Sequence, residues 1–89
     1  MTIGQEKPEY STALHGTVAA YGITPSNTVD LPNGVTRNIF VGTTGDVKVD
    51  LAVGGTVIYA NVPSGTRLNI CASRVYATLT TGTDLVAEY

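Results

Sequence analysis

Apolar and polar positions alternate most clearly between residues 46 and 53. One side of an extended chain carries Val47, Val49, Leu51 and Val53, and the other carries Asp46, Lys48, Asp50 and Ala52. This period of two predicts a strand with one buried face and one solvent-exposed face. Gly54 and Gly55 follow, and then a second strand-forming run covers residues 56–62. Because two glycines supply the positive φ angles of a two-residue turn, the pattern predicts an antiparallel hairpin.

Short strands separated by turn signals continue in both directions from this hairpin. Upstream, the sequence predicts a strand over residues 36–41 and a turn over 42–45. Downstream, Pro63-Ser64-Gly65 predicts a turn, and strands follow over 67–72, over 74–78 after a bend near Ser73, and over 84–89. Five or six short strands with a turn every 6–12 residues are typical of an all-β fold. We therefore expect a small β-sandwich or a jelly-roll-like barrel.

The N-terminal part of the chain has a different pattern of apolar and polar residues. Residues 1–22 carry scattered apolar side chains without a clean period, so we expect an extended N-terminal arm over 1–22 and a β-domain over 23–89. The arm is too apolar for a solvated tail, and an extended segment can bury such side chains on a neighbour. The predicted contact residues are Ile3, Tyr10, Leu14, Val18 and Tyr21.

The length of the chain limits how it can be stabilised. A domain of 89 residues buries only about 60–65% of its unfolded surface, so its core is thin. Cys71 is the single cysteine and His15 the single histidine, which excludes an internal disulfide and a Cys/His zinc site within one chain. Partner subunits are the remaining means of stabilisation, so we expect a homo-oligomer without metal or cofactor.

Charge and hydropathy exclude several partners. The net charge is −2 and only 13% of residues are charged, which does not fit a solvated disordered chain. The five basic residues are scattered, whereas phosphate binding needs a basic stripe, so we expect no nucleic acid. No run of 18 apolar residues occurs and the first residues lack a signal-peptide pattern, so we expect no membrane span and no secretory signal.

No group of residues predicts catalysis, and we expect a protein that is not an enzyme. Asp46 and Asp50 stand about 13 Å apart along one strand, beyond the roughly 5–9.5 Å of a glycosidase pair. His15 lies in the segment least suited to a rigid scaffold, and it is interpreted as a surface or subunit-contact residue. Cys71 is predicted to be a small buried or half-buried thiol within an alternating strand.

The tyrosines leave one alternative open, a carbohydrate- or receptor-binding β-module. They are Tyr10, Tyr21, Tyr59, Tyr76 and Tyr89. Sugar-binding modules stack rings on exposed aromatic side chains, but this chain has no tryptophan and a single phenylalanine, Phe40. Tyrosines spread this evenly more often lie at core edges or at subunit contacts.

Several motifs, taken in order, resemble a known family. They are Ile23-Thr24-Pro25-Ser26-Asn27, Asp30-Leu31-Pro32, Arg37-Asn38-Ile39-Phe40-Val41-Gly42, Gly45-Asp46-Val47-Lys48-Val49, Gly54-Gly55-Thr56-Val57, Val62-Pro63-Ser64-Gly65-Thr66, Arg74-Val75-Tyr76-Ala77-Thr78 and Asp84-Leu85-Val86-Ala87-Glu88-Tyr89. Over about residues 23–89 the chain resembles the small head-spike base and head decoration proteins of tailed phages and gene-transfer agents.

The resemblance implies a virion structural protein on the capsid exterior. Such a protein decorates or cements the head, or forms the base of a head spike. The implied partners are the major capsid protein, further copies of the chain as a trimer or pentamer, and a fibre or spike protein. The resemblance brings no catalytic residue with it. The arm lies outside the resemblance, and its contact residues are expected to bind the capsid or a neighbouring subunit.

Overall fold

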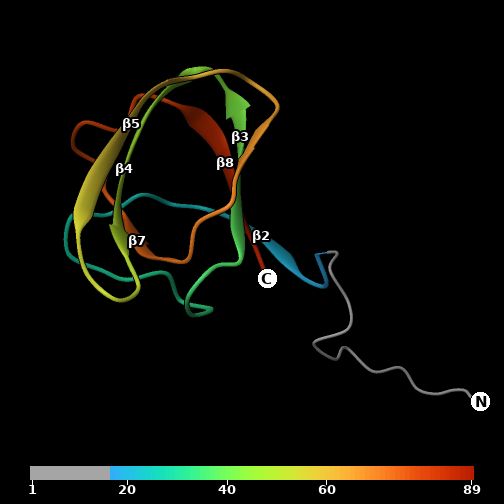
Figure 1. Ribbon diagram of the computed structural model, residues 1–89, viewed down its shortest axis with the longest axis vertical. Helices are drawn as coiled ribbons and strands as arrows, with labels where there is room; N and C mark the ends of the chain where they lie inside the picture. Colours follow the sequence, from blue (N-terminus) through green and yellow to red (C-terminus); the bar gives the residue numbers. More distant parts are fainter. Residues whose placement is uncertain (1–16) are drawn as a thin grey trace, which may run out of the picture.

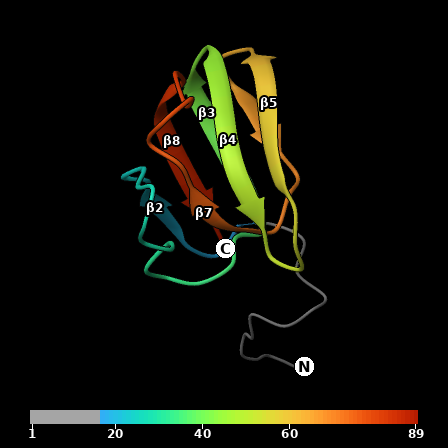
Figure 2. The same ribbon diagram turned by 90° about the vertical axis from the view of Figure 1, so that its left-hand side faces the viewer.

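The computed structural model describes residues 17–89, and within that range the secondary structure consists of strands without helix (Figure 1). The larger sheet contains β2 (Ala20–Gly22), β8 (Thr83–Glu88), β3 (Asn38–Thr43) and β6 (Thr66–Leu68), hydrogen-bonded in that order. The smaller sheet contains β5 (Thr56–Val62), β4 (Gly45–Leu51) and β7 (Ala72–Val75). All pairings are antiparallel, and Figure 2 shows the two sheets face to face. The all-β prediction is confirmed, and the fold is a sandwich.

The core lies between the two sheets and follows from the alternation within each strand. In β4, Val47 and Val49 are fully buried, while Lys48 between them faces outward and is half-buried. Ile39 and Val41 of β3 are fully buried on the opposite sheet. The other buried apolar residues of the cluster are Leu31, Val62, Ala72, Val75 and Leu85. Since burying one Val, Leu or Ile side chain stabilises a fold by about 1.5–3 kcal/mol, this small cluster dominates the stability.

The predicted hairpin is present, but its loop is longer than expected. β4 and β5 pair with Val49 opposite Val57 and Asp50 opposite Thr56. Gly54 and Gly55 have φ angles of 134° and 103°, which L-residues rarely adopt. The prediction that Val53 shares the buried face is wrong, because β4 ends at Leu51 and residues 52–55 form the connection. Val53 lies in that connection and is 102% exposed.

The predicted turn over residues 42–45 is also wrong, because the strands extend into it. β3 runs to Thr43 and β4 begins at Gly45, so the chain passes between the sheets at Thr44. Gly45 is required here by close backbone approach, since an added Cβ would lie 2.3 Å from the backbone nitrogen of Gly82. An added Cβ at Gly42 would likewise lie 2.6 Å from the Cβ of Asp84.

The break predicted near Ser73 occurs earlier, at residues 69–71. β6 ends at Leu68 in the larger sheet and β7 begins at Ala72 in the smaller one. The buried Thr36 side chain fixes this passage: its hydroxyl donates to the carbonyl of Ile70 (2.9 Å) and accepts from the Ala72 N–H (3.0 Å). Cys71 therefore lies outside any strand and is exposed, which corrects the prediction of a buried or half-buried thiol.

Two segments close the sides of the sandwich. Residues 23–37 run along the outer edge of β7, where the N–H groups of Ser26 and Leu31 donate to the carbonyls of Val75 and Ser73 (both 2.9 Å). At the other side, residues 20–22, which the sequence assigns to the arm, form strand β2. This strand pairs with β8 through Ala20 opposite Glu88, and all three of its residues are exposed.

Candidate contact surfaces

Two of the five predicted contact residues fall within the described residues. Val18 precedes β2 and is 45% exposed, and Tyr21 lies on β2 and is 48% exposed. Both are large apolar side chains that the sandwich leaves half uncovered. Ile3, Tyr10 and Leu14 lie outside the described residues. The prediction for Val18 and Tyr21 is therefore compatible with where they lie, and the other three remain predictions.

Val18 and Tyr21 lie beside the C-terminal residue of the chain. The N–H of Val18 donates to the Tyr89 carbonyl (2.8 Å), and the Tyr89 N–H donates to the Ala19 carbonyl (2.8 Å). The rings of Tyr21 and Tyr89 meet edge to face with centroids 5.9 Å apart. Such a pair contributes about 0.5–1.5 kcal/mol beyond its area burial. Burial of the Tyr89 phenol raises its pKa, and the neighbouring Tyr21 adds to this shift.

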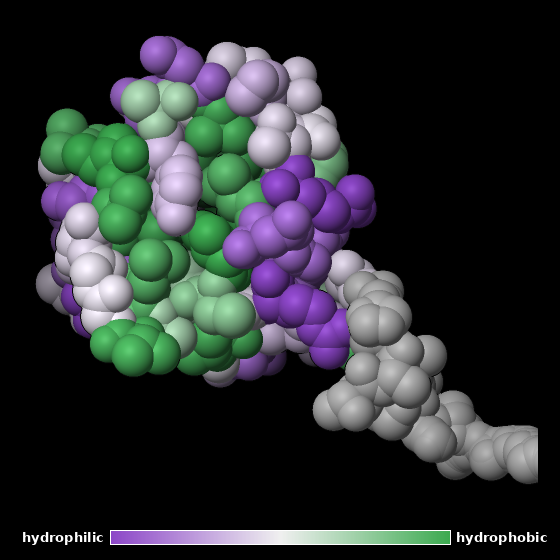
Figure 3. Space-filling view, viewed as in Figure 1, coloured by the Kyte–Doolittle hydropathy of each residue, from purple (hydrophilic) through white to green (hydrophobic). Residues whose placement is uncertain are grey.

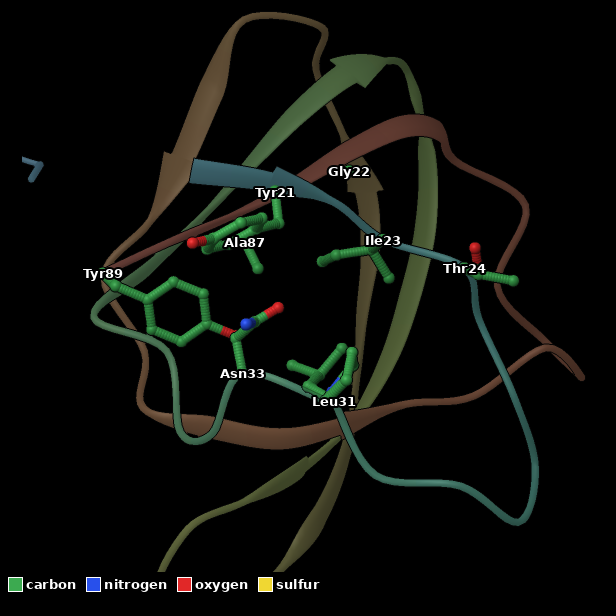
Figure 4. Close-up of a pocket in the computed structure, with 9 residues that line it drawn as sticks. Tyr21, Gly22, Ile23, Thr24, Leu31, Asn33, Ala87 and Tyr89 are labelled. Atoms are coloured by element: carbon green, nitrogen blue, oxygen red, sulfur yellow. The ribbon is translucent and has the colours of Figure 1, made fainter. Parts of the chain in front are cut away.

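A small cavity opens beside this tyrosine pair. Its lining includes Ile23, Leu31, Asn33 and Ala87 as well as the two tyrosines, and Figure 4 shows Ile23 and Leu31 facing each other across it. Its volume is about 90 Å³. Ligand pockets usually measure roughly 300–1,000 Å³, so this cavity has room for one protruding side chain, not for a small-molecule substrate. We call Val18, Tyr21, Tyr89 and this cavity the terminal surface.

A second apolar surface lies at the C-terminal end of β4, around the β4–β5 connection. A shallow groove of about 350 Å³ runs between residues 51–54 and residues 69–71. Its lining includes Val53 and Ile70, and the free thiol of Cys71. Figure 3 shows apolar residues gathered on the side of the molecule where β5 and this connection lie. We call this the hairpin groove.

Polar groups cover the outer face of β4 and β7 in the smaller sheet, and they bind one another. The carboxylate of Asp50 accepts hydrogen bonds from the hydroxyls of Thr56 and Tyr76. These bonds, that from Thr56 above all, lower the pKa of Asp50 below its ordinary value of 3.8. The Lys48 ammonium lies 4.6 Å from the centroid of the Tyr76 ring. This cluster is internally satisfied, which is typical of groups that stabilise a sheet surface.

The candidates for catalysis are not brought together. The side chain of Asp46 accepts the Asn61 N–H at 2.8 Å and so fixes an irregular point of the β4–β5 ladder. His15 lies outside the described residues. Within residues 17–89, no group of three or more His, Cys, Asp or Glu side chains could hold a metal ion. The same range contains no helix long and apolar enough to cross a membrane.

Sequence reasoning missed two residues that matter for contacts. In the sequence Tyr89 is one of five scattered tyrosines, and its pairing with Tyr21 depends on the long-range contact of β2 with β8. The sequence marks Ile58 only as one of several apolar strand residues, and its exposed fraction of 47% follows from its position opposite Lys48 on the outward-facing side of the edge strand β5. Its place in the uncharged run of 56–62 is the one sequence signal for this.

These features define a small β-sandwich whose exposed apolar side chains form contact surfaces. Searches against protein-family models and against curated proteins found no match. Among solved structures, a chain in the capsid of a native gene-transfer-agent particle, computed with C5 symmetry, is similar with a TM-score of 0.75 and 36% identity. The alignment covers 83% of this chain and 84% of that chain. The protein belongs to the family of this capsid-particle component, and membership is consistent with a non-enzymatic role.

Proposed function

We propose that the protein is a virion structural component on the capsid exterior, which decorates or cements the head or forms the base of a head spike. The observation that carries the proposal is the 36% identity, over most of both chains, to a chain of a gene-transfer-agent capsid. The proposed partners are the major capsid protein and further copies of this chain, as a trimer or pentamer. A fibre or spike protein is a further partner where the protein forms a spike base.

The terminal surface supports this proposal because it suits contact with a larger protein. Its cavity of about 90 Å³ fits one side chain, and the half-exposed Val18 and Tyr21 lie next to it. Aromatic side chains around a small pocket are typical of the residues that dominate binding energy at protein interfaces. We propose that Ile3, Tyr10 and Leu14 of the arm extend this contact along the capsid or a neighbouring subunit.

The test is attachment to capsid particles that lack the protein. The full chain should sediment with such particles. Deletion of residues 1–16 should keep the body folded by circular dichroism, because β2 starts only at Ala20, and should weaken attachment. The substitution Tyr21→Ala should weaken attachment by about tenfold or more, since truncating an aromatic hot-spot residue at an interface costs about 2 kcal/mol or more.

Leu79→Ala is the matched control for Tyr21→Ala. Leu79 is also a large apolar residue, 55% exposed, but it lies on the β7–β8 connection and outside the terminal surface. Attachment of this variant should equal that of the wild type. A folded full-length chain that does not associate with particles would overturn the proposal.

The alternative, a carbohydrate- or receptor-binding module, rests on the tyrosines. Two of them are already engaged within the protein: the Tyr76 hydroxyl donates to Asp50 (2.7 Å) and the Tyr89 hydroxyl to the Gly34 carbonyl (3.1 Å). Tyr59 packs against the core. Glycan-array binding that is lost in Tyr21→Ala, together with undiminished attachment to particles, would favour this alternative for the terminal surface.

A further inference from the structure

One edge of the sandwich is long and uncovered. β5 is the last strand of the smaller sheet, and over seven residues it pairs only with β4. The opposite edge of that sheet, β7, is covered by residues 23–37 through the hydrogen bonds described above. The two edge strands of the larger sheet, β2 and β6, have three residues each. Among the described strands, β5 is therefore the one full-length edge that could accept a further strand.

The β4–β5 ladder shows which backbone groups face outward. The Leu51 N–H donates to the Gly55 carbonyl (2.9 Å), and hydrogen-bonded pairs in an antiparallel ladder recur at every second residue. The register then makes Val49–Val57 and Val47–Tyr59 hydrogen-bonded pairs. It follows that the N–H and C=O of Thr56 and Ile58, and the N–H of Ala60, point away from β4.

The stretch of β5 before residue 60 lacks the usual protection of an edge strand. Natural edges carry charged side chains, prolines or bulges that discourage a second strand. The run 56–62 contains no charged residue and no proline. A bulge is present only at its far end, where residues 60 and 61 lie opposite Asp46 and Asn61 has a positive φ of 54°. Ile58, in the middle of the free edge, is 47% exposed. An unprotected edge of this kind either aggregates or is paired in the native assembly.

The arm of a second copy is the partner that fits this edge. Figures 1 and 2 both place β2, where the arm joins the body, on the side of the sandwich away from β5. A donor and an acceptor at different places on one chain make a head-to-tail contact, which gives a ring where the rotation between successive copies closes. Sixteen residues precede the described part of the chain, and they can span about 50 Å when extended. If residues 9–15 were extended, Tyr10, Thr12 and Leu14 would share one face, because successive side chains of a strand point to opposite faces.

We propose that residues 9–15 of one copy pair as an additional strand with the free edge of β5 in the next copy, and that this exchange closes the homo-oligomeric ring. The inference deepens the proposed function by naming the subunit contact, and it rests on that function for the presence of a homo-oligomer. Main-chain hydrogen bonds to Thr56, Ile58 and Ala60 supply the affinity, as in other cases of strand addition. The contact also covers the exposed side chain of Ile58.

The decisive variant is Ile58→Pro. Its N–H faces away from β4, so proline removes a bond to the incoming strand and leaves the β4–β5 ladder intact. We expect a folded monomer by circular dichroism and light scattering, with an apparent dissociation constant for assembly raised at least about tenfold. Val57→Pro is the matched control on the same strand: it removes an N–H that bonds to β4, so it should unfold the hairpin. Ile58→Thr keeps the N–H and should still assemble.

A mixing experiment identifies the donor. The chain lacking residues 1–16 keeps an acceptor edge but has no donor, and full-length Ile58→Pro keeps a donor but has a blocked edge. Each should be monomeric alone, and the mixture should form dimers with one chain of each kind and nothing larger. Pairing of β5 with β5 of a second copy predicts instead that the truncated chain still dimerises, which would overturn the proposal. A wild-type chain that stays monomeric would also overturn it.

The test of strand exchange can fail independently of the test of the proposed function, because self-association is measured in solution without capsid particles. A wild-type chain that attaches to capsids but never self-associates would keep the virion role and refute the strand exchange. If the two variants formed the mixed dimers but the wild-type chain did not attach to capsids, the strand exchange would be supported and the virion role refuted.

Discussion

Replacing Gly54 and Gly55 together by valine tests the β4–β5 hairpin directly. Their φ angles of 134° and 103° are accessible to glycine but strained for a β-branched residue. No atom lies within 4 Å of a Cβ added at either position, so the cost comes from backbone strain and not from a clash. At about 1–3 kcal/mol for each strained residue, the double variant should lose about 2–6 kcal/mol.

That loss is large for a domain of this size. A stability of about 0.05–0.15 kcal/mol per residue corresponds to roughly 4–13 kcal/mol for 89 residues. Each kcal/mol lowers the melting temperature of such a domain by about 4–8 °C, so the variant should melt at least about 8 °C below the wild type. Circular dichroism melts at equal protein concentration measure this, because self-association would make the melting temperature concentration-dependent.

Gly22→Ala is the control for the hairpin variant. Gly22 has no positive φ and no atom within 4 Å of an added Cβ, so alanine should keep or slightly raise the melting temperature. If the hairpin variant melted with the wild type, the positive φ angles assigned to Gly54 and Gly55, and with them the turn, would be wrong.

Two further predictions concern the smaller sheet. Gly45→Ala should cost about 1–3 kcal/mol or more, seen as a lower midpoint in urea, because its methyl group would meet the backbone of Gly82; an unchanged midpoint would contradict this close approach. Asp50→Asn should be less stable than the wild type at neutral pH. Since folding lowers the pKa of Asp50, its contribution is fully present above the ordinary value of 3.8 and disappears as the pH falls through the lowered pKa. Urea midpoints of the two proteins should therefore converge in acid, and a pH-independent difference would show that the charge of Asp50 does not matter.

Local patterns were enough to predict the strands whose two faces differ. Val47 and Val49 alternate with Lys48 and Asp50, and the structure buries the first pair and leaves the second half-exposed on the outer face. The same rule could not find β2, because Ala20, Tyr21 and Gly22 are all exposed and show no alternation. It also extended the buried face to Val53, because a period of two does not mark where a strand ends.

The remaining errors concern contacts between residues distant in sequence. The run of residues 42–45 has the composition of a turn. Its two glycines, Gly42 and Gly45, are needed instead because the chain passes close to Asp84 and Gly82 there. The bend at 69–71 is fixed by Thr36, more than 30 residues away. The terminal surface is only partly predictable for the same reason: the apolar character of Tyr21 indicates a contact residue, but nothing local in the sequence links it to Tyr89.

The pairing of β2 with β8 has a practical consequence for locating the protein on particles. The Val18 N–H donates a hydrogen bond to the Tyr89 carbonyl. A fluorescent or gold-binding tag fused after Tyr89 would therefore lie beside Val18, at the terminal surface. Such a tag would obstruct the terminal surface, whose contacts it is meant to locate. An insertion next to Val53, whose side chain is fully exposed in the β4–β5 connection, would place the label away from β2 and leave both ends of the chain unmodified.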